Sequence, residues 1–185
     1  MNEKNFAGYS PNQGKPIPIG QAKAEHAQWE ERTRSAGLPG SFTVPTHLII
    51  GALEVYREAG AGICFCNGLD AKGNYAPVMA LVAPEGKTLF AFNTKEPISI
   101  EECAECQENW VKEKGEEVLR NFFVGTNPLI NYLVQHPSNT VTASFIVDEE
   151  GLNSGALIAD PDPGTDEDDP GEALNFARPC PPYCN

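Results

Sequence analysis

Apolar side chains recur at helical spacing through residues 47–59. An apolar residue at every third or fourth position builds one continuous face of a helix, which can pack against a core. Thr46 precedes the segment as an N-cap, and Gly60 follows it as a stop signal. The sequence therefore predicts a helix here, with an apolar face made of Leu48, Ile49, Ala52, Leu53 and Tyr56.

Other segments also have the composition and end signals of helices. Ser99 and Glu102 form a capping box, and Gly115 is the stop signal of the helix that follows. The segment over residues 21–36 is rich in Ala, Glu, Gln and Arg. Its apolar stripe consists mainly of Ala22 and Trp29 and is weak, so we expect this helix to pack at the edge of the body. The further predicted helices are residues 21–36, 100–114, 116–124 and 128–135.

Short apolar runs separated by Gly, Pro, Asn and Asp predict β-strands. Three such runs follow the predicted helix over residues 47–59 in close succession, which is typical of an antiparallel meander. Pro77 lies inside the second run, so that part is expected at an edge or a bulge. Two later runs joined by Asp-Glu-Glu-Gly predict a final hairpin. The expected strands are residues 62–66, 75–83, 88–92, 141–147 and 155–159, with a short extended piece at 41–45.

These elements together predict an α+β fold. We expect an antiparallel sheet of about five strands, covered on one face by the helices that begin at His47, Ile100 and Glu116. The two ends of the chain are polar and rich in Gly and Pro, and we expect them to be extended arms without a core of their own. The predicted organisation is an N-terminal arm (residues 1–20), an α+β domain (21–159) and an acidic, Pro-rich C-terminal arm (160–185).

The composition narrows the choice of partner and compartment. The chain has 185 residues, the size of one ordinary domain, and its 26 acidic against 13 basic residues give a net charge of -13. Nucleic acids and anionic membranes attract positive charge, so we expect neither as a partner. No run reaches the roughly 18 apolar residues of a membrane-spanning helix, and the first residues lack the apolar centre of a signal peptide. We therefore expect a cytoplasmic protein with reduced thiols.

Six cysteines fall into three close pairs. A strand places the first pair on one face, and a helix places the second pair on one side. Two pairs brought together would supply the tetrahedral sulfur ligands of a zinc ion. The alternatives are ordinary buried thiols and a redox pair at the helical Cys-x-x-Cys, where neighbouring glutamates would raise the thiol pKa. The candidate metal ligands are Cys64, Cys66, Cys103, Cys106, Cys180 and Cys184.

No sequence motif for nucleophilic, nucleotide-binding or metalloprotease chemistry occurs in the chain. We expect the histidines, His26, His47 and His136, at the surface or at helix ends. The carboxylates that begin at Asp160 lack the order of a calcium-binding loop, and a solvated linker is the expectation. The sequence therefore names no catalytic residue and no resident cofactor, and it does not favour an enzyme.

The last residues, Ala-Arg-Pro-Cys-Pro-Pro-Tyr-Cys-Asn, differ in character from the acidic run before them. Paired prolines favour an extended or turned backbone. A tyrosine and two cysteines suit a peptide that packs on a surface. We expect this peptide to dock on its own body or on a neighbouring copy, with Pro181, Pro182 and Tyr183 as the interaction residues.

The stretch from Phe42 to Lys87, together with the final Cys-Pro-Pro-Tyr-Cys, resembles a group of small bacterial proteins that end in Cys-Pro-Pro-x-Cys and have no assigned activity. The resemblance implies a structural signature and contributes no catalytic residue. Cys64 and Cys66 stand outside the pattern of that group. The signature positions are Gly62, Gly68, Asp70, Cys180, Pro181, Pro182 and Cys184.

These features favour a non-enzymatic cytoplasmic protein that acts through protein–protein contacts. The favoured form is a self-assembling structural subunit whose arms exchange between copies, because an extended segment covers a large surface. The alternative is a metal-binding or thiol-redox protein that uses the paired cysteines, with zinc as its cofactor.

Overall fold

The computed structural model describes residues 9–56, 58–115, 121–160 and 172–176, and these form four α-helices, a short 3-10 helix and ten strands. The helices are α1 (Ile19–Thr33), α2 (Thr46–Tyr56), α3 (Ile100–Lys114) and α4 (Thr126–Gln135), with the 3-10 turn at Arg34–Ala36. The strands are β1 (Lys15–Pro18), β2 (Ser41–Pro45), β3 (Gly62–Cys66), β4 (Val78–Val82), β5 (Thr88–Asn93), β6 (Pro97–Ile98), β7 (Asn121–Gly125), β8 (Thr140–Val147), β9 (Asn153–Ala159) and β10 (Glu172–Phe176).

The α+β class is confirmed, and the strands form two antiparallel sheets where one was expected. The first sheet has the order β1-β10-β9-β8-β2, and the second has the order β6-β5-β4-β3-β7. Sequence patterning does not separate one sheet from two, because β3, β4 and β7 are buried on both faces. Such strands are apolar throughout and carry no alternation that marks an outer face.

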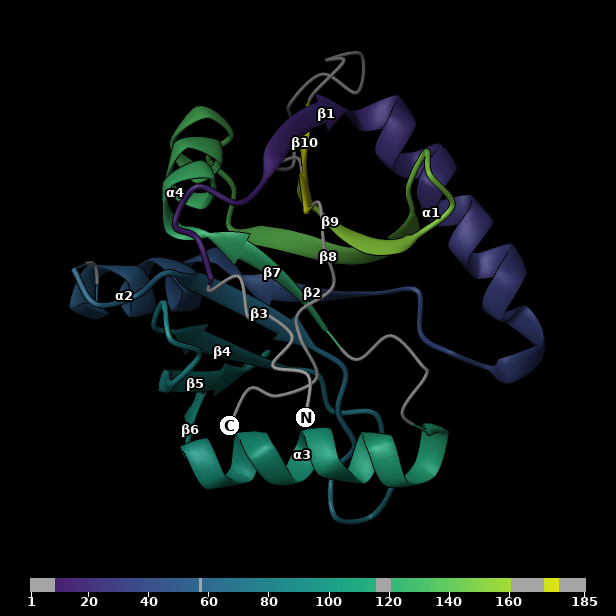
Figure 1. Ribbon diagram of the computed structural model, residues 1–185, viewed down its shortest axis with the longest axis horizontal. Helices are drawn as coiled ribbons and strands as arrows, with labels where there is room; N and C mark the ends of the chain where they lie inside the picture. The colour runs from purple at the N-terminus through teal and green to yellow at the C-terminus, as the bar shows by residue number, and fades with distance from the viewer. Residues whose placement is uncertain (1–8, 57, 116–120, 161–171, 177–185) are drawn as a thin grey trace, which may run out of the picture.

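The two sheets pack face to face, and helices cover their outer faces (Figure 1). Helix α1 packs on the first sheet, mainly on β8, while α3 packs on β4 and β5 of the second sheet. Helices α2 and α4 lie at one end of the sandwich in the view of Figure 1. The sequence predicted that the helices would cover one face of one sheet, but they lie on different faces of two sheets. Helix α1 was expected at the edge of the body and instead covers the first sheet.

The main core fills the space between the two sheets. Its largest fully buried side chains are Phe65, Phe92, Phe122 and Phe145. Gly155 of β9 is necessary for this packing, since a Cβ atom there would lie 2.3 Å from the ring of Phe122. The two sheets thus approach closely at the point where this glycine faces an aromatic ring.

Most of the sequence-predicted elements are confirmed within one or two residues at their ends. The meander corresponds to β3, β4 and β5, and the final hairpin corresponds to β8 and β9. The Ser99 hydroxyl accepts a hydrogen bond from the Glu102 amide at 3.0 Å, as a capping box requires. Pro77 lies just before β4, and the irregularity in this strand falls between Leu81 and Val82.

The helix predicted over 116–124 is wrong in its second half, because residues 121–125 form β7 beside β3. Residues 116–120 lie outside the described residues. Asn-Phe-Phe-Val-Gly is rich in residues that favour strands, and all five are buried in the second sheet. Tertiary burial therefore decides the structure of a segment whose first half has a helical composition.

Parts of both expected arms belong to the first sheet. Residues 15–18 form β1, residues 172–176 form β10, and α1 already begins at Ile19. The prolines of the first segment and the acidic run before the second conceal these strands in the sequence. The remaining arm residues, 1–8, 161–171 and 177–185, lie outside the described part of the chain.

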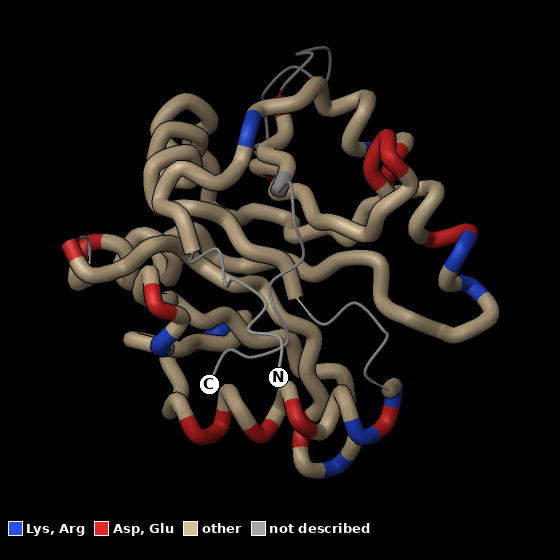
Figure 2. Tube along the Cα trace, viewed as in Figure 1, with Lys and Arg blue, Asp and Glu red and all other residues tan. Residues whose placement is uncertain are grey.

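Charged residues lie on the helices, the turns and the strands at the chain ends (Figure 2). The strands from β2 to β5 and from β7 to β9 contain no Lys, Arg, Asp or Glu. Among the described residues, the charged side chains therefore lie outside these seven strands. Among the described helices, none is long and apolar enough to cross a membrane.

Candidate functional site

The first and last described strands pair in a seam, which we define as the paired strands β1 and β10. The strands are antiparallel, with Ile17 opposite Ala173 and Lys15 opposite Asn175. Pro16 and Pro18 have no N–H groups, so the hydrogen-bonding residues of β1 are Lys15 and Ile17, and both prolines face outward. Strand β1 therefore ends the first sheet and offers no regular edge to a further strand.

The hydroxyl of Tyr132 in α4 joins β10 to β9 at the start of the seam. It donates a hydrogen bond to the Glu172 carbonyl at 3.0 Å and accepts one from the Ala159 amide at 2.8 Å. Burial raises the pKa of Tyr132 to about 12, and the nearby carboxylates of Asp160 and Glu172 act in the same direction. The side chain thus stays neutral and keeps its donor at physiological pH.

Side chains around the end of β9 fix the point where the acidic segment begins. The Asp160 carboxylate accepts hydrogen bonds from the hydroxyls of Thr140 and Thr142, each at 2.8 Å. The Ser138 hydroxyl bonds to the Asp160 carbonyl. His136, which follows α4, lies 3.9 Å from the carboxylate of Glu172 at the start of β10. Both sides of the connection from β9 to β10 are therefore held by polar contacts.

The four described cysteines lie together in one apolar cluster beneath α3. Cys64 and Cys66 of β3 and Cys103 and Cys106 of α3 are all buried in this cluster. In the sheet, Cys64 aligns with Ala80 and Ala91 of the neighbouring strands. Such a row of small residues lets a helix approach a sheet closely, which is a packing role for these thiols.

The environment of Cys106 does not favour a reactive thiolate. Burial raises the pKa of Cys106, and the carboxylates of Glu102, Glu105 and Asp70 raise it further. Among the described residues, no group of three or more His, Cys, Asp or Glu side chains is placed to hold a metal ion. The predicted ligands Cys180 and Cys184 lie outside the described residues, so the structure brings together four of the six candidates.

The described contacts give His26 a structural role. A ring nitrogen of His26 lies 2.8 Å from the Phe145 carbonyl, which ties α1 to β8. His47 is exposed in the first turn of α2, and His136 follows α4. The structure places these three side chains on separate elements.

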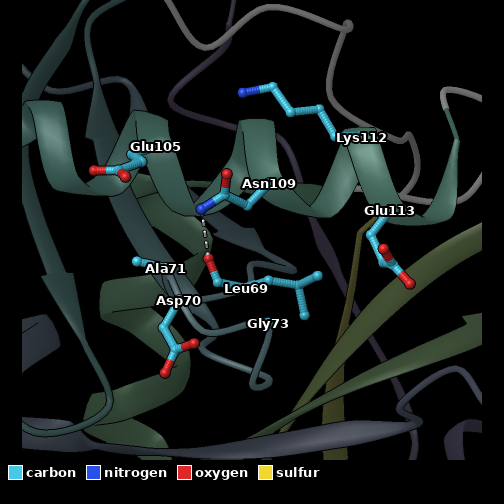
Figure 3. A pocket seen from close by; sticks show the side chains of 8 residues that line it. All are labelled: Leu69, Asp70, Ala71, Gly73, Glu105, Asn109, Lys112 and Glu113. Carbon is cyan, nitrogen blue, oxygen red and sulfur yellow. Dashed lines mark hydrogen bonds between the residues drawn. The ribbon is translucent and has the colours of Figure 1, made fainter.

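A shallow pocket of about 330 Å³ lies between α3 and the loop after β3 (Figure 3). Asp70 organises this loop, because its carboxylate accepts hydrogen bonds from the Lys72 and Asn74 amides at 2.8 and 2.9 Å. These bonds, together with one from the Asn74 side chain, lower the pKa of Asp70. The carboxylate is thus engaged in turn formation. The remaining lining includes Glu105, Asn109, Lys112 and Glu113 of α3.

Sequence reasoning missed the seam. An alternation of proline and non-proline residues at 15–18 is the signal that could have indicated an edge strand. The predicted interaction residues Pro181, Pro182 and Tyr183 lie outside the described residues. No family model, curated protein or solved structure matches this chain.

Proposed function

We propose that the protein acts through contacts with other proteins, assembles with copies of itself and has no catalytic centre. The observation that supports this most directly is the position of β10, which comes from the C-terminal arm and lies between β9 and β1. Without β10, strand β1 would have no neighbour in the first sheet and β9 would have an open edge. A position filled by a strand from a separate segment can equally receive the same strand of a second copy.

The length of the segment before β10 supports exchange. Strand β9 ends at Ala159 and β10 begins at Glu172, although the two strands are antiparallel neighbours. A hairpin needs only about two to five residues for such a connection. Residues 160–171 are therefore long enough to let β10 reach the sheet of another copy.

The mass of the native particle tests this proposal. We expect light scattering to give a dimer or a larger particle for the full chain. A matched variant lacks residues 162–169, so that β10 can pair only with its own β9, and we expect it to be a monomer with an unchanged circular dichroism spectrum. A full chain that is monomeric at every concentration would overturn the proposal. An oligomer of unchanged mass in the shortened variant would exclude β10 exchange as its basis.

We place this assembly in the cytoplasm. The four described cysteines are buried in an apolar cluster, and such a packing role for thiols fits a reducing compartment. The interaction surface would include Pro181, Pro182 and Tyr183, which follow β10 in the same exchanged arm.

The second candidate is a zinc or thiol-redox protein. It is supported by the gathering of Cys64, Cys66, Cys103 and Cys106 in one cluster. Elemental analysis of purified protein separates the two candidates. About one zinc ion per chain, lost in the double variant Cys64→Ser and Cys103→Ser, would favour the metal protein, whereas metal-free protein with its thiols reduced would favour the packing role.

A further inference from the structure

Strand β7 is the last strand of the second sheet, yet it is buried along its whole length. An edge strand has one neighbour and presents its other side to whatever lies beyond. At the Gly125 end the described residues supply a cover: the Gln13 carbonyl accepts the Gly125 amide at 2.7 Å, and the ring of Tyr9 lies 4.7 Å from that of Phe123. Burial continues past this point to Asn121.

The direction of the backbone groups of β7 follows from its pairing with β3. The Thr126 amide bonds to the Ala61 carbonyl, so Phe122 and Val124 also direct their backbone groups toward β3. Asn121, Phe123 and Gly125 then direct theirs outward. Within the described part of the chain, the backbone N–H of Phe123 has no hydrogen-bond partner, although the residue is 1% exposed. A buried N–H group requires a partner.

The chain leaves β10 next to this edge. Phe176, the last residue of β10, pairs with Gly155, and Gly155 packs on the ring of Phe122 in β7. Residues 177–185 follow. Nine extended residues span up to about 30 Å, whereas a strand of five residues is about 17 Å long. The segment is therefore long enough to return along the edge of β7.

The sequence of this segment has the proline alternation already seen in β1. In β1, Pro16 and Pro18 face outward while Ile17 pairs with β10. Pro179 and Pro181 likewise flank Cys180. In an extended chain, the N–H groups of Arg178 and Cys180 point to one side and the two prolines lie on the other. This arrangement allows pairing with one strand and prevents addition of another.

From these observations we propose that the C-terminal segment, residues 177–185, binds along the outer edge of β7 and ends the second sheet as β1 ends the first. Its Arg178–Pro181 portion pairs with the outward backbone groups of β7. The inference holds whether the segment comes from the same copy or, under the proposed strand exchange, from a second one.

Amide hydrogen exchange of the full chain provides the test, because neighbouring amides of β7 face opposite sides. We expect the Phe123 amide to be protected. In the variant Cys180→Pro and in a chain that ends at Phe176, it should exchange at least about 10-fold faster, while the Val124 amide, which faces β3, keeps its rate. Cys180→Ala removes the sulfur and keeps the N–H, so it should leave both rates unchanged.

Two results would overturn the inference: a Phe123 amide that already exchanges rapidly in the full chain, or one whose rate is the same in the shortened chain. A particle mass that shows a monomer would contradict self-assembly but would leave this exchange pattern intact. The two proposals therefore fail separately. If the Val124 amide also loses protection in the shortened chain, the truncation has disturbed the whole strand. The difference in Phe123 exchange between Cys180→Pro and Cys180→Ala then tests the proposal.

Discussion

The Tyr132 hydroxyl donates a 3.0 Å hydrogen bond to the carbonyl of Glu172 and so connects helix α4 to the first residue of β10. The same oxygen accepts the Ala159 amide. A single side chain therefore takes the place of a direct hydrogen bond between the two strands at this point. This contact holds the strand that we propose to exchange between copies.

Replacing this hydroxyl should loosen the seam. In Tyr132→Phe, the Ala159 amide and the Glu172 carbonyl lose their partner, and we expect the free energy of unfolding to fall by about 1–3 kcal/mol. Urea unfolding measures the change. Tyr56→Phe is the matched control, because Tyr56 contributes a ring contact with Phe90 and no described hydroxyl bond. Equal effects of the two substitutions would contradict the role given to Tyr132.

The raised pKa of Tyr132 predicts a loss of stability at alkaline pH. A tyrosine ionises near pH 10 in the unfolded chain, and burial raises the pKa to about 12 in the fold. Its contribution is complete below pH 10 and is lost as the pH rises through 12, because the unfolded state releases its proton first. Denaturation midpoints between pH 9 and 12 should therefore fall less steeply in Tyr132→Phe than in the parent chain, and parallel curves would refute this.

The close approach of the sheets at Gly155 can be tested by adding one methyl group. In Gly155→Ala the new Cβ would overlap the Phe122 ring, and we expect a destabilisation of about 1–3 kcal/mol. Gly51→Ala is the control, since no atom lies within 4 Å of its Cβ position in α2. That variant should gain up to about 1 kcal/mol from helix propensity. Thermal unfolding of both variants gives the comparison.

The burial of the cysteine cluster predicts slow thiol chemistry. Cys64, Cys66, Cys103 and Cys106 are each at most 8% exposed. We expect these four thiols to react with an aromatic disulfide reagent at least about 100-fold more slowly in the native chain than in urea, because reaction requires local opening. Mass spectrometry of the labelled peptides measures each rate. Rapid labelling of Cys103 in native protein would instead support the redox alternative.

Local signals allowed much of the fold to be predicted from the sequence. The helix that begins after Ser99 and the strand Gly62–Cys66 have the predicted bounds, since capping and short apolar runs are properties of neighbouring residues. The second half of the predicted helix over 116–124 failed for the opposite reason. Phe122 and Phe123 form a strand because both pair with β3, while Phe122 packs in the core between the sheets and Phe123 packs in the cysteine cluster on the other face. These partners are distant in sequence.

The candidate site was less predictable than the fold. The four described cysteines were identified by their spacing, but only the structure shows that they pack under α3. The seam depends on residues separated by most of the chain, such as Ile17 and Ala173. No local pattern specifies such a pairing, although the prolines on either side of Ile17 mark it as an edge.

The position of β10 also sets an order of events during synthesis. Strand β1 is made before the other strands of the first sheet, but its partner β10 is made after all of them. The first sheet therefore cannot form completely until β10 has been synthesised and has left the ribosome. Until then β9 keeps an open edge, and under the proposed strand exchange this edge is the acceptor for the β10 of a second copy.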